Sequence, residues 1–124
     1  MTEINCIKGV RDGISEKVQL TEGAAAMKAR AGNDERTALL VKNDGDSACG
    51  IYVEPGDGLR SAIGGLLAAV QAGELRFLEL DSMRFKHLSG AEKGCFTLRL
   101  CDPADGSKAF VGAAATMKFA VLML

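Results

Sequence analysis

His87, the only histidine, is the first residue to consider for chemistry because imidazole is the commonest general base in enzymes. Asp81 and Ser82 precede it in one short run, so a Ser–His–Asp triad could be written from these three residues. Residues so close in sequence are difficult to arrange around one substrate, and no oxyanion-hole motif accompanies them. We therefore expect a single helical turn over Ser82–Leu88, with Phe85 packed inward, and a protein that is not an enzyme.

The four cysteines are the next candidates for chemistry: Cys6, Cys49, Cys95 and Cys101. Cys95 and Cys101 are too far apart for a CxxC pair, and one distant histidine cannot complete a zinc site. Residues 1–10 lack the apolar core of a secretory signal, which favours free, buried thiols over disulfides. An enzyme that uses Cys49 as its nucleophile is the weakest of the functional hypotheses.

Acidic and glycine-rich turns could in principle bind ions or phosphates. Asp44, Asp46 and Asp57 lack the alternating ligands and the terminal glutamate of a calcium loop. The glycines of residues 56–65 form neither a phosphate loop nor a dinucleotide fingerprint. Ordinary turn chemistry explains these residues, and we expect no metal and no cofactor.

Composition excludes several partners. The chain has 15 Lys and Arg against 16 Asp and Glu, a net charge of -1, whereas proteins that bind nucleic acid need surplus positive charge. No apolar run reaches the ~18 residues of a membrane span. Tyr52 is the only tyrosine and tryptophan is absent, which disfavours stacking surfaces for sugars or single strands. We expect synthesis in the bacterial cytoplasm and no nucleic-acid or membrane partner.

Frequent turn signals separated by short apolar runs indicate a mostly-β chain. We predict a single antiparallel β-sandwich of about seven to eight short strands over residues 24–124, preceded by an N-terminal arm over residues 1–23. Residues 35–43 and 48–54 flank Asp44-Gly45, a sequence that favours a hairpin.

Two later segments differ in their alternation. Cys95–Cys101 alternates cleanly, with Phe96, Leu98 and Leu100 on one face, and so predicts a strand whose other face is solvated. Leu75–Leu80 carries apolar residues on both faces. We expect either that both of its faces are covered or that a bulge shifts its phase.

Leu59–Val70 allows two interpretations. Its apolar residues have helical spacing, but Gly64 and Gly65 would each cost a helix about 1 kcal/mol relative to alanine. We favour a loop followed by a strand over residues 66–71, which would form a second hairpin with residues 74–80.

The C-terminal segment 117–124 is apolar on both faces. Phe119 and Val121 lie on one side, and Leu122 and Leu124 lie on the other. An edge strand of this kind would invite uncontrolled pairing, so the strand is either central or in contact with a second subunit. We predict a homo-oligomer in which Leu122 and Leu124 are candidate contact residues.

Three stretches carry a family resemblance: residues 34–43, Pro55–Gly58, and the run from Leu78 to Gly94 that contains "DSxRFKHxSGxxKG". They resemble small structural proteins encoded beside the major capsid gene in tailed phages and prophages, whose run is similar to "ESxRFKNxSGxxKG". His87 departs from that pattern. The resemblance covers residues 24–124 and implies a virion protein, capsid-associated or head-decorating, with a phage capsid protein as partner. Its candidate interaction residues are Arg84, Phe85, Lys86 and His87.

A bacterial ligand-binding or adaptor module is the alternative function. Its motivation is the glycine-rich segment 56–65, which could line a pocket.

Overall fold

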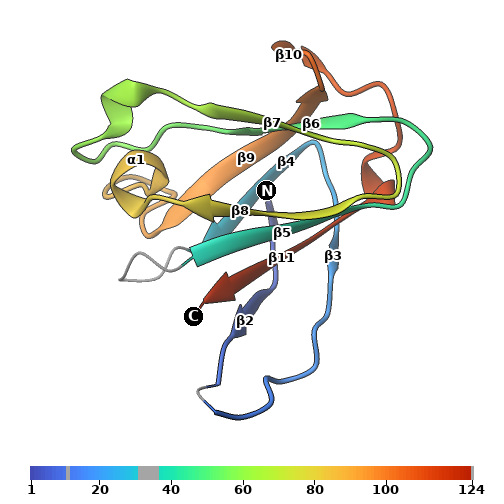
Figure 1. Cartoon of the computed structure of the whole chain (residues 1–124). Coiled ribbons are helices and arrows are strands. Elements are labelled where there is room, and N and C mark those ends of the chain that lie inside the picture. Colours follow the sequence, from blue (N-terminus) through green and yellow to red (C-terminus); the bar gives the residue numbers. More distant parts are fainter. Residues whose placement is uncertain (11, 31–36, 124) are drawn as a thin grey trace.

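Two β-sheets pack face to face around one hydrophobic core in a computed structural model that describes residues 1–10, 12–30 and 37–123 (Figure 1). Sheet A has the strand order β1-β4-β9-β6-β7, with β10 beside β9, and sheet B has the order β2-β11-β5-β8, with β3 beside β11. The strands of sheet A are β1 (Thr2–Glu3), β4 (Ala26–Arg30), β6 (Cys49–Val53), β7 (Leu66–Val70), β9 (Cys95–Asp102) and β10 (Asp105–Ala109). Those of sheet B are β2 (Cys6–Lys8), β3 (Thr21–Glu22), β5 (Thr37–Asn43), β8 (Leu75–Leu80) and β11 (Met117–Met123).

The core lies between the sheets and is built by alternate residues of the central strands. These side chains are less than 2% exposed and include Met27, Leu39, Ile51, Phe96 and Phe119. Each apolar side chain removed from water contributes about 1.5–3 kcal/mol, so this layer supplies most of the driving force for folding. The predicted β-sandwich of short strands is confirmed.

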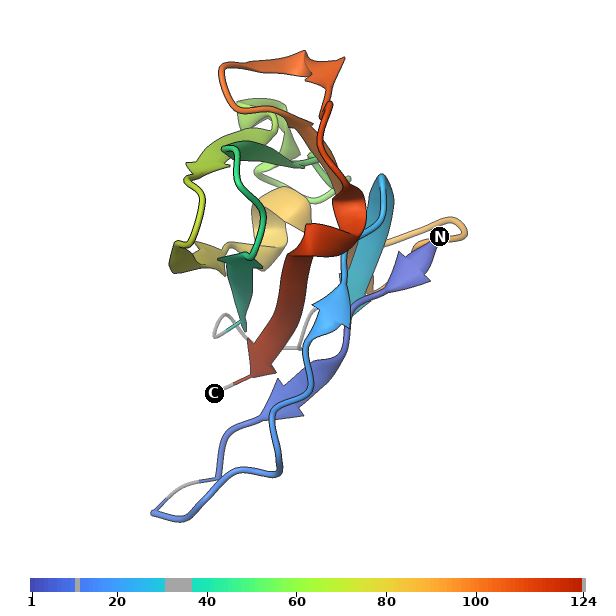
Figure 2. The same cartoon turned by 90° about the vertical axis from the view of Figure 1, so that its right-hand side faces the viewer.

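The strands are more numerous and shorter than expected, mainly because residues 1–23 add β1, β2 and β3 to the two sheets. Most pairings are antiparallel, but β1 pairs with β4 and β2 pairs with β11 in parallel. The chain between β2 and β3 projects from the body (Figures 1 and 2). The predicted arm is therefore an extension whose base belongs to the sandwich.

Neither predicted hairpin forms, because both turns carry the chain from one sheet to the other. β5 pairs with β11 and β8, whereas β6 pairs with β7 and β9. Asn43, 0% exposed, explains the crossing: its side-chain nitrogen donates to the carbonyls of Ser47 (2.9 Å) and Val70 (3.0 Å). The backbone carbonyl of Asn43 accepts from the Gly73 N–H at 2.8 Å. The side chain and backbone of Asn43 thus hold the β5–β6 and β7–β8 connections together, and these run close to each other at one end of the sandwich (Figure 1).

The ambiguous segment 59–70 is a loop with a 3-10 turn, η1 (Ser61–Ile63), followed by β7, as favoured; the helical alternative is wrong. Gly64 adopts φ +94°, a left-handed conformation that glycine tolerates. The predicted helical turn is α1 (Ser82–Phe85), and a second 3-10 turn, η2 (Ala114–Thr116), precedes β11. β11 is central, between β5 on one side and β2 and β3 on the other.

Candidate interaction surfaces

The residues that follow β8 fasten α1 to the loop between β6 and β7. Arg84 donates from Nε to the carbonyl of Gly64 (2.9 Å) and from Nη2 to that of Gly65 (2.8 Å). Its guanidinium carbon lies 4.7 Å from the centre of the Phe85 ring, which is itself 2% exposed and part of the core. The fork geometry of the guanidinium suits two adjacent carbonyls, so Arg84 is satisfied within the fold.

A second set of hydrogen bonds joins the loop between β6 and β7 to the residues that follow α1. Asp57 accepts hydrogen bonds from the backbone N–H of Leu88 and from the hydroxyl of Ser89, the latter at 2.7 Å. These bonds, first that of Leu88 and then that of Ser89, lower the pKa of the Asp57 carboxyl. A Cβ at Gly56 would lie 2.2 Å from the Lys86 carbonyl oxygen, so only glycine fits there. We call this assembly of residues 55–65 and 82–89 the clamp.

The outer face of sheet A carries a chain of polar contacts beside the clamp. His87 Nε2 lies 3.3 Å from Thr97 Oγ1, and the Thr97 hydroxyl donates to Glu54 Oε2 at 3.4 Å. Arg99 Nε lies 3.4 Å from Glu54 Oε1, and its guanidinium covers the Tyr52 ring at 4.5 Å. Thr97 is only 5% exposed, so the predicted solvated face of β9 is wrong at this residue, whereas Arg99 is half-buried. Contacts with neighbouring side chains cover Thr97.

Most of the residues that the family resemblance suggested for contact with a partner instead make contacts within the fold. Phe85 is in the core, Arg84 holds the loop, and His87 contacts Thr97. Lys86 is half-buried. The conspicuous sequence run is explained by its internal contacts.

Two of the residues considered for a catalytic triad contact other side chains. Asp81 Oδ2 lies 2.7 Å from Arg60 Nη1, whereas the His87 ring nitrogen contacts Thr97. All four cysteines are free, and burial raises the pKa of the Cys49 thiol to about 12, which disfavours the nucleophilic thiolate. Across the described ranges, no group of three or more His, Cys, Asp or Glu side chains could hold a metal ion.

The outer face of sheet B has a different character. The pairing registers place its outward residues in three rows across the strands. The first row is Leu75, Lys42 and Lys118, the second is Phe77, Leu40 and Ala120, and the third is Glu79, Ala38, Leu122 and Ile7. We call these rows together the open face.

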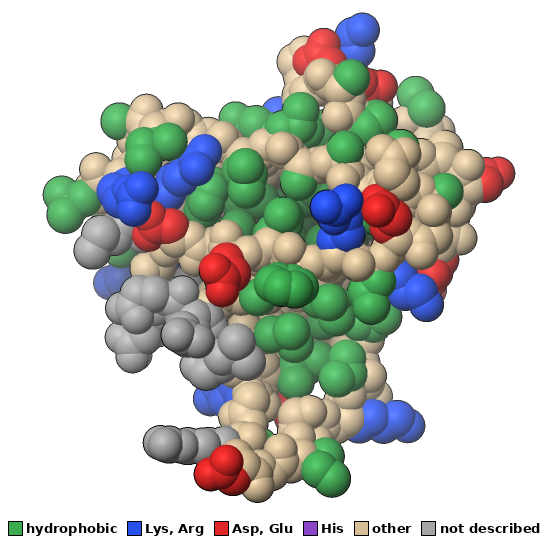
Figure 3. Space-filling model, viewed as in Figure 1, with side chains coloured by type: hydrophobic (Ala, Val, Ile, Leu, Met, Phe, Trp, Pro, Cys, Tyr) green, Lys and Arg blue, Asp and Glu red, His purple; other side chains and the backbone are tan. Residues whose placement is uncertain are grey.

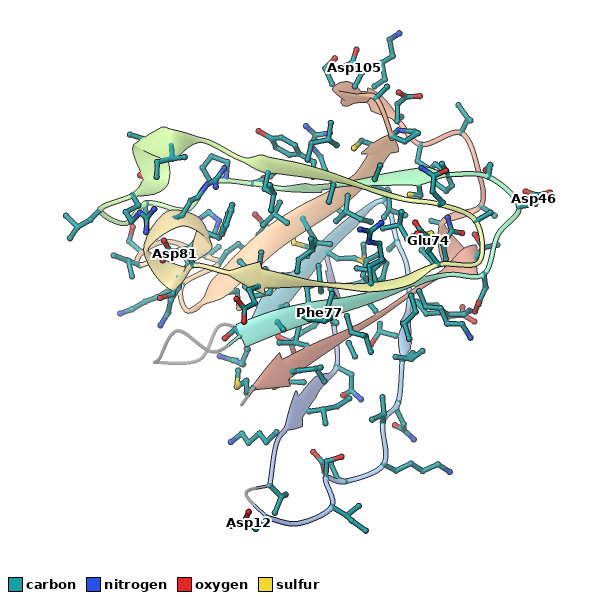
Figure 4. The ribbon with its side chains drawn as sticks, in the orientation of Figure 1. Asp12, Asp46, Glu74, Phe77, Asp81 and Asp105 are labelled. Carbon is teal, nitrogen blue, oxygen red and sulfur yellow. The ribbon has the colours of Figure 1, made fainter. Side chains whose placement is uncertain are left out.

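The apolar side chains of the open face differ in exposure, and Ile7, Ala38 and Ala120 are buried. Leu75 is 60% and Phe77 is 65% exposed, and Leu40 and Leu122 are half-buried. Figure 3 shows hydrophobic side chains gathered over β8, β5 and β11, and Figure 4 places Phe77 on β8. β8 keeps an unbroken register with β5, so no bulge explains the two apolar faces of Leu75–Leu80. Leu122 belongs to this face as expected, and Leu124 lies outside the described residues.

Two further surfaces adjoin the open face. Edge strands β7 and β8 border a hollow of about 270 Å³, lined by Val41, Ala68, Val70 and Leu78 among others. The projecting segment between β2 and β3 exposes Val10 and Ile14, the latter 93% accessible. Exposed apolar side chains that gather on one surface are typical of sites of association.

Comparison with protein-family models, with curated proteins and with solved structures found no match to this chain. Within the described residues, no helix has the length and apolar character needed to cross a membrane.

Proposed function

We propose that this protein is a non-enzymatic structural component of a phage or prophage virion, associated with the capsid or decorating the head. Its open face is the binding surface for a capsid protein and for further copies of the chain. The observation that carries this proposal is the exposure of the Phe77 and Leu75 side chains on the outer face of sheet B. A contiguous apolar patch on a small protein marks a contact site more often than chance exposure does.

The family resemblance supports the same role indirectly. The run from Asp81 to Gly94 overlaps the clamp, which secures α1 and the loop between β6 and β7. A run that holds the scaffold together would be shared by proteins with the same fold, even where their partner-binding surfaces differ. The contact surface is then expected elsewhere on the molecule, and the open face meets that expectation.

The experiment is mass spectrometry of particles purified from a lysate of the bacterium that carries the gene. The chain should be present at a fixed copy number relative to the major capsid protein, and its gene should lie among portal, protease and capsid genes. A Phe77→Ser variant should be lost from the particles, whereas Lys108→Glu on β10 should be retained. A protein absent from purified particles, in a locus of metabolic genes, would contradict the proposal.

A ligand-binding module is the second candidate, and one observation favours it. A hollow of about 440 Å³ at the base of the projecting segment is lined by polar side chains that include Glu3, Asn5 and Arg30. The glycine-rich loop no longer motivates this function, because α1 binds much of it. A ligand at 100 times its Kd would add about 2.7 kcal/mol of stability, so a thermal-shift screen tests the idea directly. Melting temperatures unchanged across a broad library would eliminate it.

A further inference from the structure

We propose that the projecting segment between β2 and β3 of one copy docks in the hollow between β7 and β8 of a second copy, with Ile14 as the inserted side chain. This head-to-tail contact goes beyond the proposed function, because its surfaces lie outside the open face except for Phe77, which borders both. It rests only on the shape of the chain, so it can be tested on the purified protein.

The hollow opens onto the core at the edge of the sandwich, where β7 ends the strand order of sheet A and β8 ends that of sheet B. Its lining includes the core residues Val41 and Val70, which are 0% and 2% exposed. The charged residue of the lining, Arg76, is paired with Glu74 at 3.4 Å. The volume of about 270 Å³ is below the roughly 300–1,000 Å³ of ordinary ligand sites. The hollow therefore suits an aliphatic side chain better than a small-molecule ligand.

β7 presents an apolar edge without the usual protection against pairing. Its sequence, Leu66–Val70, contains neither the charged residues nor the proline that natural proteins place on exposed edges. β7 pairs with β6 on one side, and the strand order of the described residues ends at β7 on the other. A strand of this kind is expected to gain a neighbour when the protein assembles.

The projecting segment supplies the apolar side chains that the hollow lacks. Ile14 is 93% exposed, and Val10 and Val18 are 54% and 48% exposed. Residues 14–18 belong to no helix or strand, so they are available to lie along an edge strand. Moving Ile14 from water into a hollow lined by Val41 and Val70 is favourable, because it removes apolar surface from solvent.

The strand order of sheet B makes this contact intermolecular. β2 and β3 pair with β11 on the side away from β5 and β8. Three strand spacings of about 4.8 Å, roughly 14 Å in total, thus separate β2 from β8. The segment projects from the far side of β11 (Figures 1 and 2), so Ile14 cannot enter the hollow of its own chain. Because the two surfaces differ, the contact repeats from copy to copy and generates a ring or an open chain.

Disulfide cross-linking of the full chain tests the contact directly, in a Cys6→Ser background that removes the partly exposed native thiol. Ile14→Cys mixed with Ala69→Cys should form a covalent dimer on mild oxidation, because Ala69 is exposed at the hollow. Neither variant should cross-link alone, and a chain that carries both changes should form covalent multimers beyond the dimer. Lys108→Cys, exposed on β10, is the matched control and should stay unlinked when mixed with Ile14→Cys.

Sedimentation equilibrium measures the strength of the same contact. The wild type should self-associate, and Ile14→Asp should weaken association at least tenfold, because a carboxylate would enter an apolar hollow. Ile14→Leu keeps an aliphatic side chain and should associate like the wild type. Circular dichroism verifies that each variant is folded, as expected for changes at a side chain that is 93% exposed.

Three results would overturn the docking: a wild type that stays monomeric at high micromolar concentration, Ile14→Asp that associates like the wild type, or a mixture that cross-links no faster than each cysteine variant alone. A protein found in virions but not cross-linked in this way would refute the docking and leave the virion role standing. Cross-linked multimers of a protein that is absent from virions would do the reverse.

Discussion

The outer faces of the two sheets differ in how their side chains are satisfied. On sheet A, Tyr52, Arg99, Glu54, Thr97 and His87 form a continuous series of contacts. On sheet B, the apolar side chains of Leu75 and Phe77 are left accessible. Both faces belong to one sandwich and share one core, so fold stability alone does not require the difference. The polar, sequence-conspicuous region makes contacts within the fold, whereas the exposed apolar region is the surface that we propose for a partner.

Two phenylalanines provide the largest contrast between the clamp and the open face. Phe85→Ala should destabilise the protein by about 3–5 kcal/mol, because Phe85 is 2% exposed and belongs to the core. Phe77→Ala, at a side chain 65% exposed, should change the unfolding free energy of the monomer by no more than about 0.5 kcal/mol. Urea unfolding at low protein concentration measures both. Equal losses of stability would abolish the distinction between the two regions.

Two arginines give a contrast of intermediate size. Arg84→Ala removes two charged hydrogen bonds to carbonyls and should cost about 1.5–3 kcal/mol. Arg84→Lys should recover only part of this loss, since an ammonium cannot reproduce the fork. Arg76→Ala removes an exposed contact with Glu74 and should cost about 0.2–1 kcal/mol. Thermal unfolding of the three variants orders them, and an Arg84 variant as stable as the wild type would show that the clamp is dispensable.

The clamp should also respond to acid through Asp57. Its folded pKa is below the unfolded value of about 3.9, so the unfolded chain binds more protons between the two values. The stabilisation from Asp57 is therefore complete above the unfolded pKa and is lost as pH falls through the folded pKa. The difference in unfolding free energy between wild type and Asp57→Asn should therefore shrink towards zero as the pH falls from the unfolded pKa to below the folded pKa. Urea unfolding between pH 2 and 6 measures this difference, and a gap independent of pH would refute the assignment.

Thiol reactivity gives the smallest effect and tests whether sheet A is closed. Cys95 and Cys101 lie on the same side of β9 as Thr97, yet both are buried. Burial likewise protects Cys49, whose pKa is raised to about 12. A thiol reagent near neutral pH should modify Cys6, the one partly exposed cysteine, before the others. Rapid labelling of Cys95 or Cys101 in the native protein would show that the outer face of sheet A opens readily.

The sequence predicted the parts of this fold that depend on local pattern. Alternation identified β9 and its core residues, and the Gly64-Gly65 pair favoured a loop over a helix in segment 59–70. The sheet crossings could not be predicted, because an Asp-Gly turn suits a hairpin equally well and the deciding contact is Asn43 with Val70, distant in sequence. A buried asparagine within an apolar strand is the signal that could have indicated a corner.

The candidate surface was signalled in the sequence but misinterpreted. The two apolar faces of Leu75–Leu80 were expected to indicate burial or a bulge, whereas the outward one is exposed. The run containing Arg84 and His87 attracted attention because its residue types suit recognition. Their actual partners, Gly64 and Thr97, come from other elements, and no local pattern reveals that pairing.

The central claim is that association buries the outer face of sheet B and leaves that of sheet A unchanged. Hydroxyl-radical footprinting of the wild type at low and high protein concentration measures side-chain accessibility on both faces at once. Phe77 and Leu75 should become protected as concentration rises, whereas Tyr52 and Leu67 on sheet A should be oxidised at the same rate throughout. Protection of Tyr52 and Leu67 with unchanged oxidation of Phe77, or no concentration dependence on either face, would contradict the account.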